Sequence, residues 1–454
     1  MKTKLSGKFL TALIIFSLIG QVAWVVENMY FNVFIYKAFN ASASDISLMV
    51  SASSIAAAVT TLIIGALSDK VGKRKIFICG GYIAWGISIL SFALLRVDII
   101  SAIFPKAASA AAIGVSLTVI LDCVMTFFGS SANDAAFNAW LTDSTDKTNR
   151  GAAEGINAMM PLVAILVVFG GFMAFDLDLP ESWTAIFIII GSVVILIGVL
   201  GIFLIDDPAV KVSENGKYFA NIIYGFKPTV IKQNYVLYLC LAAFAIFGIS
   251  IQIFMPYLIL YYTEALKMSN YVLIMAPAVI LASVATFFYG RLYDKFKFEK
   301  SVMPTIAMLV LGYILLFFFT HTAMVFIGSL FMMSGYLTGM AIFGAVIRDY
   351  TPPKKSGMFQ GLRIVGQVLI PGIIGPWIAA LVLKNAEKVT NDDGTQSFIP
   401  NRNVFLAALI AAVVCAAFLI LVFHFMKREK EKLKLLENTQ QNAAEIGSTK
   451  MVND

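Results

Sequence analysis

Charged residues are scarce in this chain of 454 residues: only 13% are Asp, Glu, Lys or Arg, while 59% are hydrophobic. Average soluble domains carry about 25% charged residues and about 45–50% apolar ones. With a mean hydropathy of +0.84, the chain has too few polar side chains to cover a water-facing surface of this size. The composition excludes a soluble enzyme, a disordered protein and a fibrous repeat. It predicts a polytopic membrane protein whose surplus apolar surface faces lipid.

Cysteine and histidine are scarce too, with four and two copies. The cysteines are far apart and each lies in an apolar run, so we expect buried thiols rather than disulfides or a metal site. Two histidines leave little for a zinc or acid–base enzyme, and the sequence has no Gly-Lys-Ser/Thr loop for ATP phosphates. We therefore expect no cofactor, no metal and no enzymatic activity. The residues concerned are Cys79, Cys123, Cys240, Cys415, His321 and His424.

Twelve runs are long and apolar enough to cross a membrane as helices, since a span needs about 20 mostly apolar residues. We predict an all-α fold with two six-helix halves, residues 1–205 and 235–426. A cytoplasmic loop at 206–234 with an amphipathic helix separates them, and a cytoplasmic tail at 427–454 begins as a charged helix and becomes partly disordered. The expected spans are residues 9–36, 45–68, 76–96, 111–138, 155–176, 183–205, 235–262, 270–290, 302–320, 323–347, 357–383 and 403–426.

The N-terminal lysines, Lys2, Lys4 and Lys8, precede the first run as in a signal peptide. The apolar character continues well past the core of a signal, and no small-residue cleavage site follows. We therefore expect an uncleaved first helix.

Basic residues lie mostly on one side of the predicted membrane. With the N-terminus placed inside, 27 of the 34 Lys and Arg residues fall in inner segments, as the positive-inside rule requires. Both termini are therefore expected in the cytoplasm, with the chain in the plasma (inner) membrane. The net charge of +7 suits the anionic face of a membrane better than a nucleic acid. The expected partners are the lipid bilayer, a small solute and a coupling cation, and we expect a monomer.

Two loop sequences recur at equivalent places in the two halves. Gly65–Lys75 reads GALSDKVGKRK and Gly290–Lys300 reads GRLYDKFKFEK, so Gly, Leu, Asp and Lys recur at the same offsets. Asp143–Gly155 and Asp349–Gly361 likewise share an Asp, a Thr and two Gly at the same spacing. The repeats indicate a duplicated architecture of six plus six helices. Transporters built this way keep the substrate site near mid-membrane, between halves that rock about it.

The loop Gly65–Lys75 resembles the loop motif of the major facilitator superfamily, G-x-L-x-D-x-x-G-R-K-x-basic. The resemblance covers residues 1–430 and implies the twelve-helix fold of that family. It also implies a latch on the cytoplasmic side, in which Asp69 meets the N-terminal end of the helix starting near Gly357 and holds the outward-open state. A tight basic turn that only fixes topology is the alternative. The expected latch residues are Gly65, Asp69, Gly72, Arg74 and Asp294.

Within the superfamily, the chain is most similar to the glycoside–pentoside–hexuronide:cation symporters and their relatives. The similarity lies in Asn133-Asp134 of the fourth span and in the Trp140-Leu-Thr that follows. It implies that Asp134 binds the solute or the coupling cation. The sodium-coupled members carry carboxylates in the middle of the second helix, whereas the equivalent stretch Ile55–Ile64 has none. This departure favours H⁺ over Na⁺ as the coupling cation.

Ionisable residues inside spans are costly and mark candidate functional positions. Glu27 lies in the middle of the first span, and Asn28 and Asn32 share one helix face close beside it. A carboxylate with amides facing a wet cavity would recognise sugar hydroxyls or take up a proton. Buried polar packing is the alternative.

The fourth span carries two further carboxylates. Asp134 lies in its inner half with Asn138 one turn on, and Asp122 lies three turns further out, where it could line the same cavity or its external mouth. We expect Asp134 and Asn138 to take part in coupling or substrate binding. A helix-end position facing the cytoplasm, or pairing with an arginine, is the alternative.

The seventh span is the counterpart of the first and is rich in aromatic residues. Gln252, Tyr257, Tyr261 and Tyr262 form a candidate substrate wall, because aromatic faces stack on sugar rings and amides bond to hydroxyls. Ordinary aromatic packing is the alternative. In the eleventh span, Arg363 is a candidate substrate contact, with an inter-helix salt bridge as the alternative.

The leading prediction is a secondary active transporter that moves a small polar solute, a sugar or glycoside, by alternating access with a cation gradient. One alternative is an efflux antiporter of amphipathic compounds, which would have a greasier cavity. A membrane-embedded enzyme would need carboxylate or histidine clusters at the interface, and none is convincing. A sensor that binds the solute without moving it is the last alternative.

Overall fold

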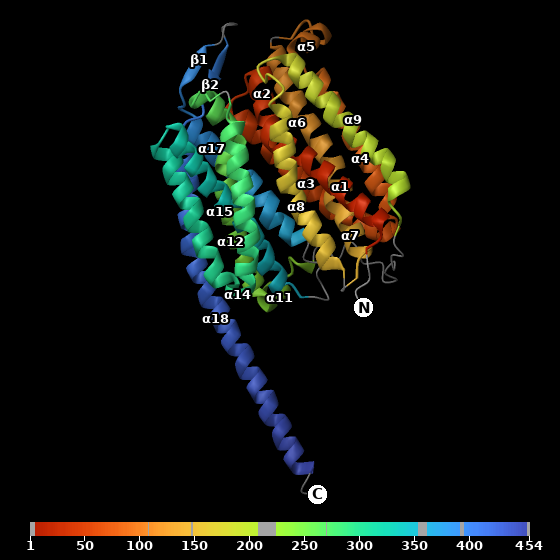
Figure 1. The fold of residues 1–454 in the computed structure, drawn as a ribbon, viewed down its shortest axis with the longest axis vertical. Helices are drawn as coiled ribbons and strands as arrows, with labels where there is room; N and C mark the ends of the chain where they lie inside the picture. Colours follow the sequence, from red (N-terminus) through yellow and green to blue (C-terminus); the bar gives the residue numbers. More distant parts are fainter. Residues whose placement is uncertain are drawn as a thin grey trace.

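Helices make up almost all of the computed structural model (Figure 1). Within the described residues, twelve helical stretches are long and apolar enough to cross a membrane, which confirms the predicted number. Span 1 is Gly7–Phe39, span 2 Ala43–Val71, span 3 Arg74–Leu94, span 4 Ala110–Asp143, span 5 Arg150–Phe172, span 6 Pro180–Leu204, span 7 Tyr235–Ala265, span 8 Val272–Tyr293, span 9 Lys295–Phe318, span 10 Thr322–Tyr350, span 11 Gly361–Leu383 and span 12 Asn403–Lys432. The structure describes residues 5–107, 109–146, 149–207, 224–268, 270–352, 361–390 and 395–451.

The first six spans form one half of the molecule, the N-half. Spans 1 and 4 are each interrupted near mid-length by a π-helical turn, which adds a residue to the helix and re-aims the side chains there. The elements are α1 (Gly7–Val25), η1 (Val26–Tyr30), α2 (Phe31–Phe39), α3 (Ala43–Val71), α4 (Arg74–Ser91), η2 (Phe92–Leu94), α5 (Val97–Ile103), α6 (Ala110–Gly129), η3 (Ser130–Phe137), α7 (Asn138–Asp143), α8 (Arg150–Phe172) and α9 (Pro180–Leu204).

The last six spans form the C-half. Helix α14 contains spans 8 and 9. Near the start of span 9, Lys297 has a φ of 59° and a ψ of −177°, which break the helix. Spans 7 and 11 contain π-helical turns as spans 1 and 4 do. The elements are α11 (Pro228–Gln233), α12 (Tyr235–Phe254), η4 (Met255–Tyr257), α13 (Leu258–Leu260), η5 (Tyr261–Ala265), α14 (Val272–Phe318), α15 (Thr322–Tyr350), η7 (Val365–Leu369), α17 (Ile370–Leu383), β1 (Lys388–Thr390), β2 (Gln396–Phe398) and α18 (Asn403–Met451).

Local sequence signals set the ends of helix α3. At its start, the Ser42 hydroxyl accepts from the Asp45 N–H while the Asp45 carboxylate accepts from the Ser42 N–H, the reciprocal capping box that favours a helix start. At its end, Gly72 adopts a φ of 69°, a left-handed conformation that glycine reaches without strain. This turn places the following residues against the end of span 4.

The two ends of the helical bundle differ (Figure 1). Both chain termini lie at one end, which we call the terminal face. The antiparallel strands β1 and β2, paired from Lys388↔Phe398 to Thr390↔Gln396, lie at the other end, which we call the hairpin face. Helix α18 continues beyond the terminal face to Met451. The amphipathic helix expected within the 206–234 loop lies mostly outside the described residues.

Candidate functional site

Accessible side chains form a row along span 1, from the terminal face to the middle of the membrane. The row consists of exposed or half-buried side chains whose spacing of three, four or seven residues places them on one helix face. Its members are Thr11, Ile14, Leu18, Gln21 and Asn28. Beyond Asn28 the next eight side chains are all buried. The row therefore ends at mid-span.

Spans 4, 7 and 10 carry matching accessible rows in their terminal halves. The row of span 4 holds Asp134, Asn138 and Thr142, while those of spans 7 and 10 reach Gln252 and Leu337. Amides and a carboxylate are costly against lipid, so these rows face water. From these rows we infer a polar cleft that opens to the terminal face.

The two halves are joined near the hairpin face. The Tyr30 and Tyr271 hydroxyls are 2.9 Å apart, and the Ser47 and Tyr257 hydroxyls are also 2.9 Å apart. The Tyr257 hydroxyl donates to the Ala43 carbonyl at 2.8 Å. Between described residues, every hydrogen bond across the two halves lies in this part of the membrane. The structure is thus closed at the hairpin face, with the cleft floor near mid-membrane.

Glu27 points away from the cleft, toward span 4. It is only 8% exposed, and its Oε1 accepts from the Thr126 hydroxyl at 2.8 Å. Asp122, one turn before Thr126 on α6, is 1% exposed and faces Ser53 of α3. Among the described residues, Glu27 Oε2 and Asp122 Oδ1 have no hydrogen-bond partner. Two buried carboxylates with unsatisfied oxygens therefore lie just behind the cleft floor.

Asp134 lies at the floor of the cleft, in the π-helix of span 4. Its carboxylate accepts from the Ser130 hydroxyl at 3.1 Å and from the Asn133 amide at 3.5 Å. The indole of Trp24 faces it from span 1, and this indole packs 5.0 Å from that of Trp85. The Trp24 N–H makes no hydrogen bond within the described residues. Asp134 thus combines partial access to the cleft with a fixed position.

The three carboxylates form one electrostatic cluster. Glu27 interacts with both Asp122 and Asp134, and among the described residues no Lys or Arg contributes to the environment of these three groups. Buried charges need a partner of opposite charge, because removing them from water costs several kcal/mol each, at order of magnitude. Since no basic side chain balances them, this cluster requires a proton or a cation.

The candidate asparagines satisfy the backbone at the π-helical turns. Asn28 donates to the Trp24 carbonyl at 2.8 Å, and the buried Asn32 donates to the Asn28 carbonyl at 2.9 Å. Asn138 donates to the carbonyls of Asn133 and Asp134 at 3.2 and 3.1 Å. Asn28 and Asn138 remain exposed toward the cleft, so their side-chain oxygens are placed to accept from a ligand hydroxyl. Asn32 lies beyond the floor.

The aromatic residues of span 7 lie outside the cleft in this conformation. Tyr257, Tyr261 and Tyr262 are each at most 2% exposed. Tyr257 belongs to the closed hairpin face, while the Tyr262 hydroxyl lies 2.7 Å from that of Ser329 inside the C-half. Of the expected substrate wall, only Gln252 lies on an accessible row.

The loop between spans 2 and 3 is organised by one buried arginine. Arg74 is 3% exposed and donates to Asp69 at 2.5 Å, to Asp143 at 2.9 Å and to Ser68 at 2.6 Å. Asp69 thus pairs with Arg74 of its own loop, while the helix start near Gly357, its expected partner, lies outside the described residues. Around Gly65, an added Cβ would meet no atom within 4 Å. Among the described residues, none approaches Gly65 closely, whereas Arg74 packs against the end of span 4.

The second half repeats this arrangement only in part. Asp349, the counterpart of Asp143, accepts from the Tyr293 hydroxyl at 2.6 Å, so a tyrosine replaces the arginine. The side chain of Asp294 and the residues around Gly357 lie outside the described part of the chain. Arg363 donates to Gln367 at 3.1 Å, on the side of span 11 that carries partly accessible residues.

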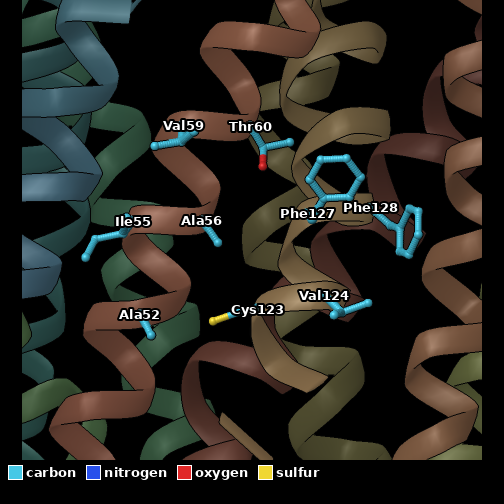
Figure 2. Close-up of a pocket in the computed structure, with 9 residues that line it drawn as sticks. All are labelled: Ala52, Ile55, Ala56, Val59, Thr60, Cys123, Val124, Phe127 and Phe128. Atoms are coloured by element: carbon cyan, nitrogen blue, oxygen red, sulfur yellow. The ribbon is translucent and has the colours of Figure 1, made fainter. Parts of the chain in front are cut away.

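An apolar groove runs between α3 and α6 on the outer side of this site (Figure 2). Its volume is about 430 Å³, and it contains no ionisable carboxylate or amine. Cys123 lines it, whereas the adjacent Asp122 is buried on the other side of α6. The groove faces lipid and is not the polar site. Its walls are Ala52, Ile55, Ala56, Val59, Thr60, Cys123, Val124, Phe127 and Phe128.

Residues 12–343 match the family model of the Major Facilitator Superfamily. The chain belongs to this superfamily. A mutant of the nucleoside transporter NupG has a TM-score of 0.70 at 13% identity, over 90% of this chain and 98% of that one. An inward-facing bacterial homolog of the human lysosomal transporter Spinster scores 0.68 at 17% identity, over 93% and 98%. The xylose transporter XylE from E. coli scores 0.66 at 14% identity, over 90% and 96%. No curated protein sequence matches the chain.

Membership of the superfamily makes the chain a transporter with twelve membrane helices rather than an enzyme. The similarity to solved structures supports the fold alone, because identity is low. Sequence reasoning missed Trp24, Thr126 and Ser53 as neighbours of the carboxylates. Thr126 had a detectable signal, since it lies four residues after Asp122 on one face of α6.

Proposed function

We propose that this chain is a proton-coupled secondary active transporter of a small polar solute, a sugar or glycoside. The observation that carries the proposal is the pair Glu27 and Asp122: two buried carboxylates with unsatisfied oxygens and no basic partner among the described residues. Protons neutralise such carboxylates without needing the larger oxygen shell of a metal ion. The absence of a carboxylate from Ile55–Ile64 also favours H⁺ over Na⁺.

In the proposed site, the solute binds at the cleft floor next to the proton site. Asn28, Asn138 and Gln252 supply amide groups for hydroxyls, and the Trp24 indole supplies an aromatic face beside Asp134. Asp134 connects the two, because it is accessible from the cleft and interacts with Glu27. Proton uptake at Glu27 thereby affects the carboxylate of Asp134, which faces the solute.

The proposed orientation follows the basic residues. The terminal face carries most of the lysines and arginines and therefore lies in the cytoplasm, in the inner membrane, with the chain acting as a monomer. The hairpin face is then extracellular, and the structure is the inward-facing state of an alternating-access cycle.

The proposal is tested with purified protein in liposomes and a panel of glycosides, pentoses and nucleosides. We expect an inward proton gradient to drive accumulation of at least one of these solutes and a protonophore to abolish it. Glu27→Gln, which keeps the shape but cannot exchange a proton, should lose concentrative uptake while still exchanging solute across the membrane. Asn28→Ala is the matched control and should raise the KM for the solute while leaving uptake dependent on the proton gradient. Accumulation driven by Na⁺ at constant pH, or outward pumping of a lipophilic cation with no sugar uptake, would overturn it.

A further inference from the structure

One lysine joins the two halves at the hairpin face. Lys37, in the last turn of α2, lies 2.5 Å from Glu264 Oε1 of span 7 in the C-half. The two side chains are 19% and 17% exposed, so the pair is largely shielded from water. Among the described residues, no other ion pair joins the two halves.

Each member of this pair also has a partner within its own half. Lys37 lies 2.6 Å from Asp178, in the loop between spans 5 and 6, which Asp176 orients by accepting from the Asp178 N–H at 3.0 Å. Glu264 lies 3.7 Å from Lys267 just beyond η5. Asp178 and Lys267 are both 71% exposed. When the halves separate, neither Lys37 nor Glu264 is left without a counter-charge.

We propose that Lys37 and Glu264 form the gate that holds the hairpin face closed, and that Asp178 and Lys267 are exchange partners that ease its opening. A shielded ion pair that breaks without replacement partners leaves two uncompensated charges, which is unfavourable. Here Asp178 competes with Glu264 for Lys37, and Lys267 competes with Lys37 for Glu264. Removing a gate residue therefore favours opening, whereas removing an exchange partner strengthens the remaining pair and favours closure.

Cysteine labelling reports this equilibrium without a measurement of transport. Ser51 is 5% exposed and lies in the span 2–span 11 contact, where its hydroxyl is 3.3 Å from the Gly372 carbonyl. Ser51→Cys keeps the size of the side chain and reports opening by its rate of reaction with a membrane-impermeant maleimide added outside intact cells. The background carries Cys123→Ser, since the other three cysteines are buried. Lys432→Cys, on the terminal face, should react only after permeabilisation.

Lys37→Met and Glu264→Gln should raise the labelling rate roughly fivefold, the change expected for an ion pair of about 1 kcal/mol. Asp178→Asn and Lys267→Met should lower it or leave it unchanged. Each of the four variants removes one charge from the same cluster. A general loss of folding would therefore change labelling in the same direction in all four, rather than raise it in two and not in the others. Equal labelling in all variants, or a faster rate in all four, would overturn the proposal. Because the readout is independent of transport, its outcome is separate from that of the proton-coupling experiment.

Discussion

At the scale of single residues, neighbours in the sequence have opposite surroundings. Glu27 is buried against Thr126 of span 4, while Asn28 is exposed to the cleft. The proposed proton site and the proposed solute site are therefore adjacent on span 1 but face different sides of the helix. In the proposed mechanism, the charge at Glu27 affects the cleft floor through Asp134 without direct contact between solute and proton.

Asp69 is the residue to test in the loop between spans 2 and 3. We expect Asp69→Asn to reduce solute uptake several-fold, because it loses the charged partner of Arg74 at 2.5 Å and weakens the proposed latch. Insertion and yield should stay normal, since Arg74 keeps Asp143. The neighbouring exposed Lys70 provides the control Lys70→Gln, which should transport as the parent does. Unchanged uptake in Asp69→Asn would remove the latch hypothesis.

Residue-level function could be predicted only in part. Carboxylates within apolar runs are visible in the sequence, so the cost of burying them made Glu27, Asp122 and Asp134 candidates, and the family resemblance added to the case for Asp134. Their directions could not be read from it, since a π-helical turn adds a residue and shifts every later side chain on the helix. Asn28 and Asn32 were expected on one face, and the Asn32 amide does donate to the Asn28 carbonyl. Only Asn28 reaches the accessible row, because the row ends at the cleft floor.

At the scale of elements, the contact between spans 2 and 11 determines how tightly the hairpin face closes. Pro376 has no N–H, so the Gly372 carbonyl one turn earlier lacks its usual helical partner. Ser51 donates to that carbonyl at 3.3 Å, and the Ser47 hydroxyl donates to the Pro376 carbonyl at 2.6 Å. Serines of one half therefore satisfy the backbone of a proline-bent helix in the other.

Gly372→Ala should destabilise the closed state, because an added Cβ would overlap the Ser54 hydroxyl. Overpacking of this kind costs roughly 1–3 kcal/mol, which should appear as a lower melting temperature in detergent and as reduced uptake. Ser54→Ala in the same chain should recover part of the loss. Gly170→Ala, where an added Cβ meets no atom within 4 Å, is the control. Equal melting temperatures for the two glycine variants would contradict this packing argument.

At the scale of the whole molecule, the described residues leave the cleft open at the terminal face and closed at the hairpin face. The accessible rows of spans 1, 4, 7 and 10 start at the terminal face, and the hydrogen bonds between halves lie at the other. If the two halves rock about mid-membrane, the hairpin face would be open and the terminal face closed in the other state of the cycle.

Accessibility labelling tests this asymmetry directly. Single cysteines at Gln21, Asn138 and Ala341, all on accessible rows, should react with an impermeant maleimide added to the terminal face in inside-out vesicles. A cysteine at Asn32, which is fully buried, should react slowly from either side. Faster labelling of the first three from the hairpin face than from the terminal face would contradict the closed state described here.

The twelve-helix fold was predictable because length and hydropathy set it: each run of about 20 apolar residues must span the membrane. The conformational state could not be predicted from the sequence. Closure at the hairpin face depends on pairs such as Tyr30 and Tyr271, which are distant in the sequence and carry no charge pattern. Lys37 and Glu264 were likewise missed, since each lies at the end of an apolar run and looks like an ordinary boundary residue.

The unbalanced carboxylates behind the cleft floor have a consequence for energetics. In the proposed cycle, the Glu27 and Asp122 site is neutral when protons are bound and negatively charged when it is empty. A membrane potential acts only on the charged form, by about 2.3 kcal/mol per charge per 100 mV. In the proposed cycle, an inside-negative voltage therefore drives the return of the empty carrier toward the outside, and the chemical gradient of protons alone drives the loaded step.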